Sequence, residues 1–524
     1  MNGEFDPSLD GWSFKNWGEE HPYCRGCALP AGHTGACEFP WDNYRDAYLG
    51  INPTHDCIEA PPDCAFYEIF KTCAKDGNCG GMSLLALALY KYGGFMGFCS
   101  PASFYTGTRP KAPDRDDLHR AINILQARQF SAKGIMNFVE TWDANNINDA
   151  LNAYQRVSEQ LAKGDYAVLS IANDYLGDAA HTVIPYKVED NPPSHPGKKV
   201  MHIWDPNHPY DDDPSHYSGT DKLLVIKGRH DWTYTSGSTT YIGADGGWCF
   251  AVPMSTVLTK SRQPMALELF AEALITLFTS GPGSAISQIS DDEGHRFYTT
   301  DADIHTSRLE FETDPELRLK GVVRWPWFFK QKEQSTPGEL YFIRREKSNT
   351  NPLNFTVSGT EYKVITSLGN NLIEFNSKSR KRTKDIIKTY GPISDAISMD
   401  IKSTAKRKQI NVDHLLIDKT KKEWRRFKIN NMSLLENTPV TIEIENNMKE
   451  VKISSKEKKV QFELAIEQRA NKKVSINNVG KMSTLPNRIM RIAPKNWKNL
   501  EKTEIIKDVI ENEKKQRTYK RREK

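Results

Sequence analysis

The sequence lacks any uninterrupted apolar run long enough to cross a membrane. A membrane-spanning helix needs about 18 to 20 consecutive apolar residues, whereas the apolar stretch at 82–90 is short and the one at 266–280 contains Glu268 and Glu272. The first residues also lack the basic start and the apolar core of a secretory signal. We therefore predict a protein without a membrane span, and we expect it in the cytoplasm unless a non-classical route exports it.

Apolar and aromatic residues are not scarce, so the chain is expected to fold. Its 524 residues are 38% hydrophobic and 10% aromatic, which is typical of globular proteins, and they exceed what one hydrophobic core usually organises. The net charge of +4 hides an asymmetry, because 21 of the 71 Lys+Arg but 32 of the 67 Asp+Glu lie in residues 1–260. An acidic first half and a basic second half predict separate domains.

Eight of the nine cysteines lie within the first 99 residues. Because no secretory signal is seen, disulfides are the least expected explanation, and metal binding or catalysis remain. Cys24, Cys27, His33 and Cys37 form a C-x2-C-x5-H-x3-C pattern that resembles a zinc knuckle. With all four positions filled by the protein, a zinc ion held there would be structural.

Other interpretations of these cysteines stay open. The knuckle residues could form an unliganded loop or a Cys24–Cys37 disulfide, and His21 could replace one of the ligands. For the cysteines without a clear spacing we expect buried thiols. These are Cys57, Cys64, Cys73 and Cys99.

Sequence periodicity divides the chain into five regions. A Cys/His-rich segment at 1–50 precedes a region at 51–260 with helical spacing at 81–92, 116–128 and 147–163 and strand patterns at 166–171, 181–188 and 199–204. Because the helices come before the strands, the expected fold class is α+β. The run MALELFAEALITLF predicts a helix within a connector at 261–317. Alternating segments at 318–500 predict a β-sandwich-like region, and 501–524 form a basic tail, either helical or disordered.

Cys79 is the candidate nucleophile. It lies between small residues at the start of an apolar helix, in the segment GNCGGMSLLALALY. The amino terminus of a helix stabilises a thiolate, and the backbone N–H of Cys79 could donate to a developing oxyanion. Gly80 and Gly81 would leave room for a substrate backbone, and Asn78 could supply an amide donor.

His181 and Asp205 supply the partners that a catalytic thiol requires. His181 opens the strand pattern of DAAHTVIPYKVED, and Asp205 closes the next one in HIWDPNHPY. If these strands are antiparallel neighbours, both residues lie at the same edge of the sheet. A thiol nucleophile needs a base within hydrogen-bond reach, and the base needs an acceptor that fixes its tautomer.

A glycine-flanked Cys on a helix, then a His on a strand, then a D-P-N turn resembles the papain-like cysteine peptidases, especially those of the bacteriocin-processing type. The resemblance covers residues 60–255 and implies a helix bearing the nucleophile packed on an antiparallel sheet. It also implies Cys79 as nucleophile, His181 as general base and acid, and Asp205 or Asn207 as the orienting residue. No cofactor is implied for catalysis, and the expected substrate is a peptide or protein.

One position departs from that family. The family commonly has a Gln about six residues before the nucleophile, where its amide helps to form the oxyanion hole, but here the position is Cys73. Loss of one such donor can lower the rate by roughly a hundredfold or more. A catalytically inactive binding protein with the same fold is therefore an alternative function.

Basic clusters in the second half raise a third possible function class, nucleic-acid binding. The clusters at 378–384 and 406–408 and the tail could contact phosphates, and together with a zinc knuckle they would suit a nucleic-acid-binding protein. No recognisable reading module or aromatic platform accompanies them, so the sequence argues against nucleic acid as a partner. The sequence does not indicate an oligomeric state.

Overall fold

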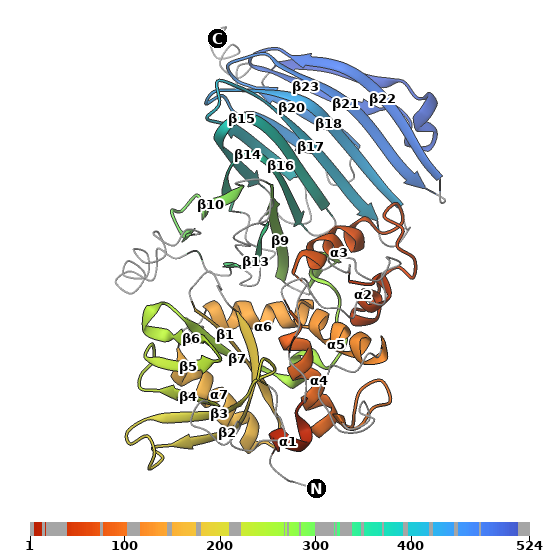
Figure 1. The fold of residues 1–524 in the computed structure, drawn as a ribbon. Helices are drawn as coiled ribbons and strands as arrows, with labels where there is room; N and C mark the ends of the chain where they lie inside the picture. The colour runs from red at the N-terminus through yellow and green to blue at the C-terminus, as the bar shows by residue number, and fades with distance from the viewer. Residues whose placement is uncertain are drawn as a thin grey trace. The chain divides into compact units, whose positions relative to one another are not determined.

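The computed structural model divides the chain into two compact units, each described here by itself (Figure 1). Unit 1 spans Met1–Pro264 and Trp325–Phe329, and unit 2 spans Met265–Arg324 and Lys330–Lys524. The residues that the structure describes are 5–12, 16, 39–73, 77–101, 116–143, 149–173, 180–208, 222–266, 268–269, 272–281, 284–298, 319, 322–324, 338–346, 351–368, 371–390, 397–418, 423–444, 449–470 and 473–511. Unit 1 mixes helices and an antiparallel sheet, and unit 2 is built from antiparallel strands.

Unit 1 begins with helices, as the periodicity predicts. Their bounds are α1 (Pro7–Asp10), α2 (Trp41–Ala47), α3 (Pro61–Cys73), α4 (Cys79–Lys91), α5 (Asp116–Arg128), α6 (Ala132–Asp143), α7 (Ala150–Ala162) and α8 (Met254–Val257). The expected helices at 81–92, 116–128 and 147–163 are confirmed as α4, α5 and α7. Helix α4 is buried on all sides from Gly80 to Leu89, which fits its almost wholly apolar sequence.

Among its described residues, unit 1 also contains a seven-stranded antiparallel sheet, in the order β6-β5-β4-β3-β2-β1-β7. The bounds are β1 (Ala167–Ala172), β2 (His181–Asp190), β3 (Lys199–Trp204), β4 (Leu223–Ile226), β5 (Trp232–Ser236), β6 (Thr239–Ile242) and β7 (Trp248–Pro253). Alternate residues such as Leu169, Ile171 and Val183 form a buried core with Ala153 and Val157 of α7. Helix α4 contacts β2 and β1, and Ser83 near its start donates to the Thr182 carbonyl of β2 at 3.1 Å.

The described residues of unit 2 form an antiparallel sheet of seventeen strands. Their bounds are β8 (Glu268–Leu269), β9 (Glu272–Ser280), β10 (Ala285–Asp291), β11 (Arg296–Tyr298), β12 (Val322–Arg324), β13 (Gly338–Glu346), β14 (Leu353–Leu368), β15 (Asn371–Tyr390), β16 (Ile397–Ser403), β17 (Arg407–Asp418), β18 (Glu423–Leu435), β19 (Val440–Ile444), β20 (Val451–Ser455), β21 (Val460–Ala470), β22 (Lys473–Thr484), β23 (Arg488–Pro494) and β24 (Ile505–Glu511).

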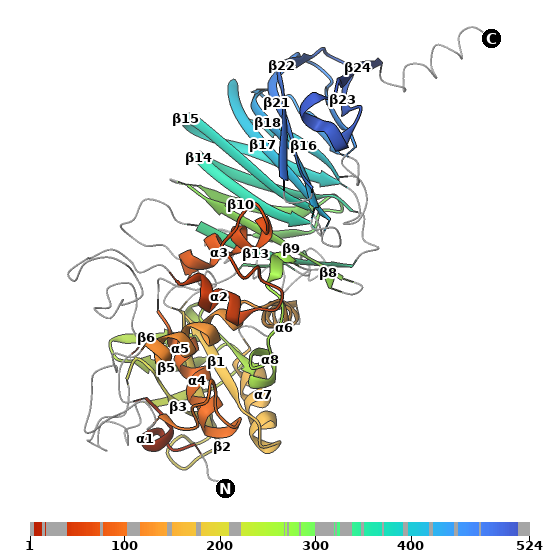
Figure 2. The same cartoon turned by 90° about the vertical axis from the view of Figure 1, so that its right-hand side faces the viewer.

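The long strand β15 divides this sheet into two branches. Its first part, 371–378, pairs with β17, and its last part, 385–390, pairs with β16. One branch continues through β18, β21 and β22, and the other through β19, β20, β23 and β24. Figure 2 shows the strands of unit 2 in a view turned by 90° from Figure 1. Strands β16, β19 and β20 bury every second residue, as expected for strands with one face on a core.

The structure corrects two predictions about the ends of unit 2. The run at 265–278 does not form a helix, because most of it lies in β8 and β9, so the predicted helical connector is wrong. Part of the predicted tail is instead a strand, since Ile505–Glu511 pairs with β23. No helix in the described part of the chain combines the length and apolar character needed to cross a membrane.

Candidate active site

His181 and Asp205 form the centre of the candidate site. Strand β2 opens with His181, and its antiparallel neighbour β3 ends one residue before Asp205. The predicted pairing of these two strands is therefore confirmed. His181 Nε2 lies 2.7 Å from Asp205 Oδ1, and both side chains are buried, with 3% and 0% of their surfaces exposed. Strand β3 ends here because Pro206 has no N–H to continue the ladder.

Cys79 completes the arrangement from helix α4. Gly77, with φ at 133°, allows the turn that leads into Asn78 and the first helical residue. The half-buried Cys79 side chain shares a hydrogen bond with His181. Since Nε2 of His181 faces Asp205, Nδ1 is the ring nitrogen available to the thiol. The structure thus brings together the three residues that the sequence motif predicts as nucleophile, base and orienting acid.

The imidazolium of His181 and the carboxylate of Asp205 each stabilise the charged form of the other inside the protein. Burial by itself lowers the pKa of His181, but the charge and hydrogen bond of Asp205 and the contact with Cys79 raise it to about 10. Burial by itself raises the pKa of Asp205, but His181 and the hydrogen bond from Tyr234 hold it well below its usual range. An imidazolium beside a thiol favours the thiolate, which is the nucleophilic form.

Asp205, and not Asn207, bonds to the His181 ring. Asn207 contributes its backbone N–H, which donates to Asp205 Oδ1 at 2.8 Å. The second carboxylate oxygen, Oδ2, accepts from the Tyr234 hydroxyl at 2.6 Å. Tyr234 lies on β5 and is missed by the sequence analysis, because a Tyr in an alternating strand carries no signal that separates a hydrogen-bonded partner from a packing residue.

Asn16 is the second residue that the sequence analysis misses. Its side-chain Oδ1 accepts from the backbone N–H of Asn78 at 2.8 Å, and its Nδ2 donates to Asn207 Oδ1 at 3.1 Å. Its backbone N–H donates to the Pro206 carbonyl at 2.8 Å. Asn16 therefore joins the segment before the nucleophile to the turn that carries the acid.

Gly80 and Gly81 do not open space for a substrate. A Cβ at Gly81 would lie 2.3 Å from the Ile122 carbonyl oxygen, and one at Gly80 would lie 2.1 Å from Gln129 Nε2. Both glycines are buried, and they allow α4 and α5 to approach closely. The expectation that they admit a substrate backbone is therefore wrong, because Ile122 of α5 and Gln129, which follows α5, occupy that space.

The amino terminus of α4 supplies the candidate oxyanion donors. The first N–H groups of a helix have no acceptor within the helix. The N–H of Gly81 already has an acceptor, because it donates to Gln126 Oε1 at 2.6 Å. The backbone N–H of Cys79 itself is therefore the candidate donor. Asn78 is buried, and its side chain makes no capping bond to α4. Cys73, at the position of the expected Gln, is the last residue of α3.

Three of the four cysteines that were expected to be buried thiols differ from that expectation. Cys57 and Cys64 are joined by a disulfide with a Cα–Cα distance of 5.4 Å, so neither is a buried free thiol. Cys99 is free but exposed. Burial raises the pKa of the Cys249 thiol far above its usual range. The knuckle residues Cys24, Cys27, His33 and Cys37 lie outside the described residues.

One residue of the basic clusters in unit 2, Lys408, does not face solvent, whereas its neighbours Lys406 and Arg407 are exposed. Lys408 has a fully buried side chain that is paired with Asp385 and donates to Thr383 Oγ1 at 2.8 Å. Lys378 is exposed and is paired with Glu361 at 3.1 Å. Lys408 is therefore part of an internal ion pair and cannot contact a phosphate backbone.

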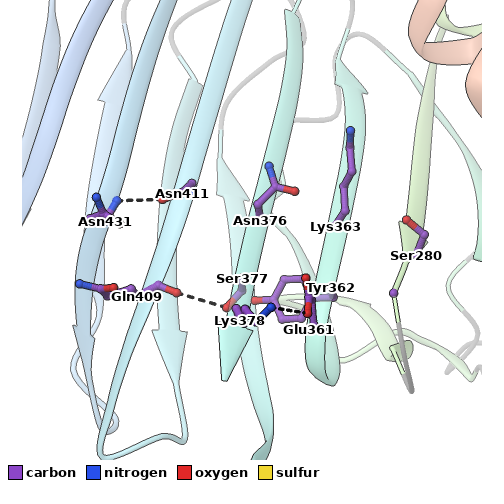
Figure 3. A pocket seen from close by; sticks show the side chains of 11 residues that line it. Ser280, Glu361, Tyr362, Lys363, Asn376, Ser377, Lys378, Gln409, Asn411 and Asn431 are labelled. Atoms are coloured by element: carbon purple, nitrogen blue, oxygen red, sulfur yellow. Dashed lines mark hydrogen bonds and ion pairs between the residues drawn. The ribbon is translucent and has the colours of Figure 1, made fainter. Parts of the chain in front are cut away.

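Unit 2 also carries a polar hollow of about 430 Å³ on its sheet (Figure 3). The hollow is lined by Ser280, Gly281, Glu361, Tyr362, Lys363, Asn376, Ser377, Lys378, Gln409, Asn411 and Asn431. Its polar groups are partly bonded to one another, as the dashed lines between Asn431 and Asn411 and between Lys378 and Glu361 show. These lining residues include no thiol or imidazole, so the hollow does not offer the chemistry of the Cys79 site.

No protein-family model, curated protein or solved structure matches the chain.

Proposed function

We propose that unit 1 is a thiol-dependent hydrolase of peptide or amide bonds that resembles the papain-like cysteine peptidases. The observation that supports this most is the buried His181 ring, which is hydrogen-bonded to Asp205 on one side and to Cys79 on the other. Helix α4, which carries the thiol, contacts the antiparallel sheet that carries the base, and this arrangement fits the proposed fold family.

In the proposed reaction the Cys79 thiolate attacks the substrate carbonyl carbon. The tetrahedral intermediate carries its negative charge on oxygen, where the N–H of Cys79 can donate. The C–N bond then breaks, and the His181 imidazolium gives its proton to the leaving amine, which leaves an acyl-thioester on Cys79. His181 next removes a proton from water, which attacks the thioester and releases the acid and the thiolate. An amine in place of water would make the same site an acyltransferase.

The proposal is tested by iodoacetamide labelling between pH 5 and pH 9, with each site mapped by mass spectrometry. Cys99, which is exposed and free, serves as the internal reference, and Cys249, which is buried, serves as the unreactive control. We expect Cys79 in the wild type to be labelled below pH 7 about ten times faster than Cys99. In His181→Ala this advantage should disappear.

Asp205→Asn and circular dichroism separate lost activation from lost folding. A folded Asp205→Asn protein should keep part of the advantage at a shifted pH, since the base remains but its tautomer is no longer fixed. Labelling of Cys79 at the Cys99 rate in the wild type, unchanged in His181→Ala, would overturn the proposal and leave a binding protein.

A further inference from the structure

Three soft metal ligands meet in unit 1 within the segment that leads into α3. One ligand atom from each of His55, Cys57 and Cys64 lies within 4.8 Å of the others. His55 and Cys57 are exposed, whereas Cys64, in the first turn of α3, has 5% of its surface exposed. In this structure the two sulfur atoms are joined as a disulfide.

The segment between these residues is held by bonds that do not depend on the disulfide. Asp56 Oδ1 accepts from the backbone N–H groups of Ile58 and Glu59, at 2.8 and 3.1 Å. The Asn52 side chain donates to Glu59 Oε2 at 3.0 Å. After reduction, Cys57 and Cys64 would therefore remain close together, with little loop entropy left to lose on binding a metal.

The imidazole of His55 is also held in place. It stacks on Trp41, with ring centroids 4.4 Å apart and an angle of 16°, and it meets Tyr67 edge-on at 5.1 Å. Trp41 is itself fixed, because its Nε1 donates to the Asn52 carbonyl at 3.2 Å. Supporting contacts of this kind orient a ligand ring and strengthen metal binding.

We propose that His55, Cys57 and Cys64 form a redox-gated zinc site, independent of the proposed hydrolase function. A dithiol reductant supplies two electrons and two protons to the Cys57–Cys64 bond and becomes a disulfide itself. Zinc then displaces a proton from each thiol and is bound by two thiolates and the His55 imidazole. Water takes the fourth position of the tetrahedron. A small-molecule disulfide takes two electrons from the two thiolates and is cleaved to two thiolates itself, which closes the Cys57–Cys64 bond and releases Zn²⁺, since a disulfide sulfur is not a thiolate ligand.

Thiolate and imidazole are the ligands that select zinc among the common divalent ions, whereas calcium and magnesium require oxygen ligands.

The site differs from the Cys24–Cys37 region, so the experiment must count zinc ions on the full chain. Reduced wild type, Cys57→Ser and His55→Ala are loaded with zinc, freed of excess metal and analysed for zinc per chain. Cys99→Ser is the matched control, because it removes an exposed free thiol outside the cluster.

We expect the control to equal the wild type, and Cys57→Ser and His55→Ala each to hold one zinc fewer. In the wild type, bound zinc should also slow the closure of the Cys57–Cys64 disulfide by an added oxidant at least about tenfold, and this protection should vanish in His55→Ala. Zinc content in either variant equal to that of the wild type, or disulfide closure unaffected by zinc, would overturn the proposal.

Discussion

Asp205 depends on its neighbours because none of its surface is exposed to water. Its Oδ1 is bonded to His181 and Asn207, and its Oδ2 accepts from Tyr234. A buried carboxylate that loses one donor retains its full desolvation cost. We therefore expect Tyr234 to act as a positioning residue, which holds Asp205 against the His181 ring.

Tyr234→Phe tests this role. Removal of the hydroxyl should lower the free energy of unfolding by about 1.5 to 3 kcal/mol, the usual worth of a hydrogen bond to a charged group. It should also shift the pH profile of Cys79 labelling, which a purely structural role would leave unchanged. Tyr154→Phe is the matched control, since Tyr154 is a buried tyrosine on α7 that does not bond to Asp205. Urea unfolding at pH 7 measures the free energy of unfolding of both variants. Equal losses in Tyr234→Phe and Tyr154→Phe would contradict the role.

The His181–Asp205 pair also predicts how stability depends on pH. The pKa of His181 is about 10 in the folded protein and about 6.5 in an unfolded chain. Its stabilisation is therefore complete below about pH 6.5 and is lost as the pH rises toward 10. The pKa of Asp205 is lowered, so its stabilisation is present above about pH 4 and is lost only in stronger acid.

Urea unfolding at pH 6.5, 8 and 9.5 measures this effect. The free energy of unfolding of the wild type should fall across this range by at most about 1.4 kcal/mol per pH unit. In Asp205→Asn the fall should be smaller, because the cause of the raised His181 pKa is removed. Identical slopes in the two proteins would show that other groups carry the pH dependence.

At the scale of elements, the contact between α4 and α5 requires a glycine. Alanine usually stabilises a helix by about 1 kcal/mol relative to glycine, but at Gly81 its Cβ would meet the rigid Ile122 carbonyl at 2.3 Å. Overpacking of this kind costs about 1 to 3 kcal/mol, so we expect Gly81→Ala to lower the melting temperature. Gly228→Ala is the control, since its nearest neighbour, Asp231 Cβ, is 3.9 Å away. Equal melting temperatures would contradict the packing argument.

Some elements could be predicted from the sequence, because an element buried on one side has apolar residues at a regular spacing. Helix α5 and strand β3 have the bounds that their patterns predict. Strand β9 is different, because residues 275–279 are all buried. A strand buried on both faces shows no alternation, and its Ala, Leu and Glu favour a helix locally. Pairing with β13 and β14 overrides that preference.

At the scale of the whole molecule, the charge asymmetry does not locate the division between the units. Residues 261–317 carry 3 Lys+Arg against 11 Asp+Glu, so the acidic character of the sequence continues past the division between Pro264 and Met265. The Cys79, His181 and Asp205 group could be predicted because each residue lies in a local motif. Asn16 and Tyr234 could not, because Asn16 lies 62 residues from Asn78 and 191 from Asn207, and Tyr234 lies 29 from Asp205. Single-sequence patterns do not reach over such separations.

The position of Asn16 matters to anyone who produces this protein. Chain ends usually tolerate tags, trimming and protease nicks, but here residues 5–12 and Asn16 belong to the framework of the site. Trp12 has no exposed surface and donates to the Met82 carbonyl at 2.9 Å, and Asn16 links Asn78 to Asn207. A preparation nicked before residue 17 would lose that link while keeping almost all of its mass, so protein quality should be checked by intact mass and not by gel mobility.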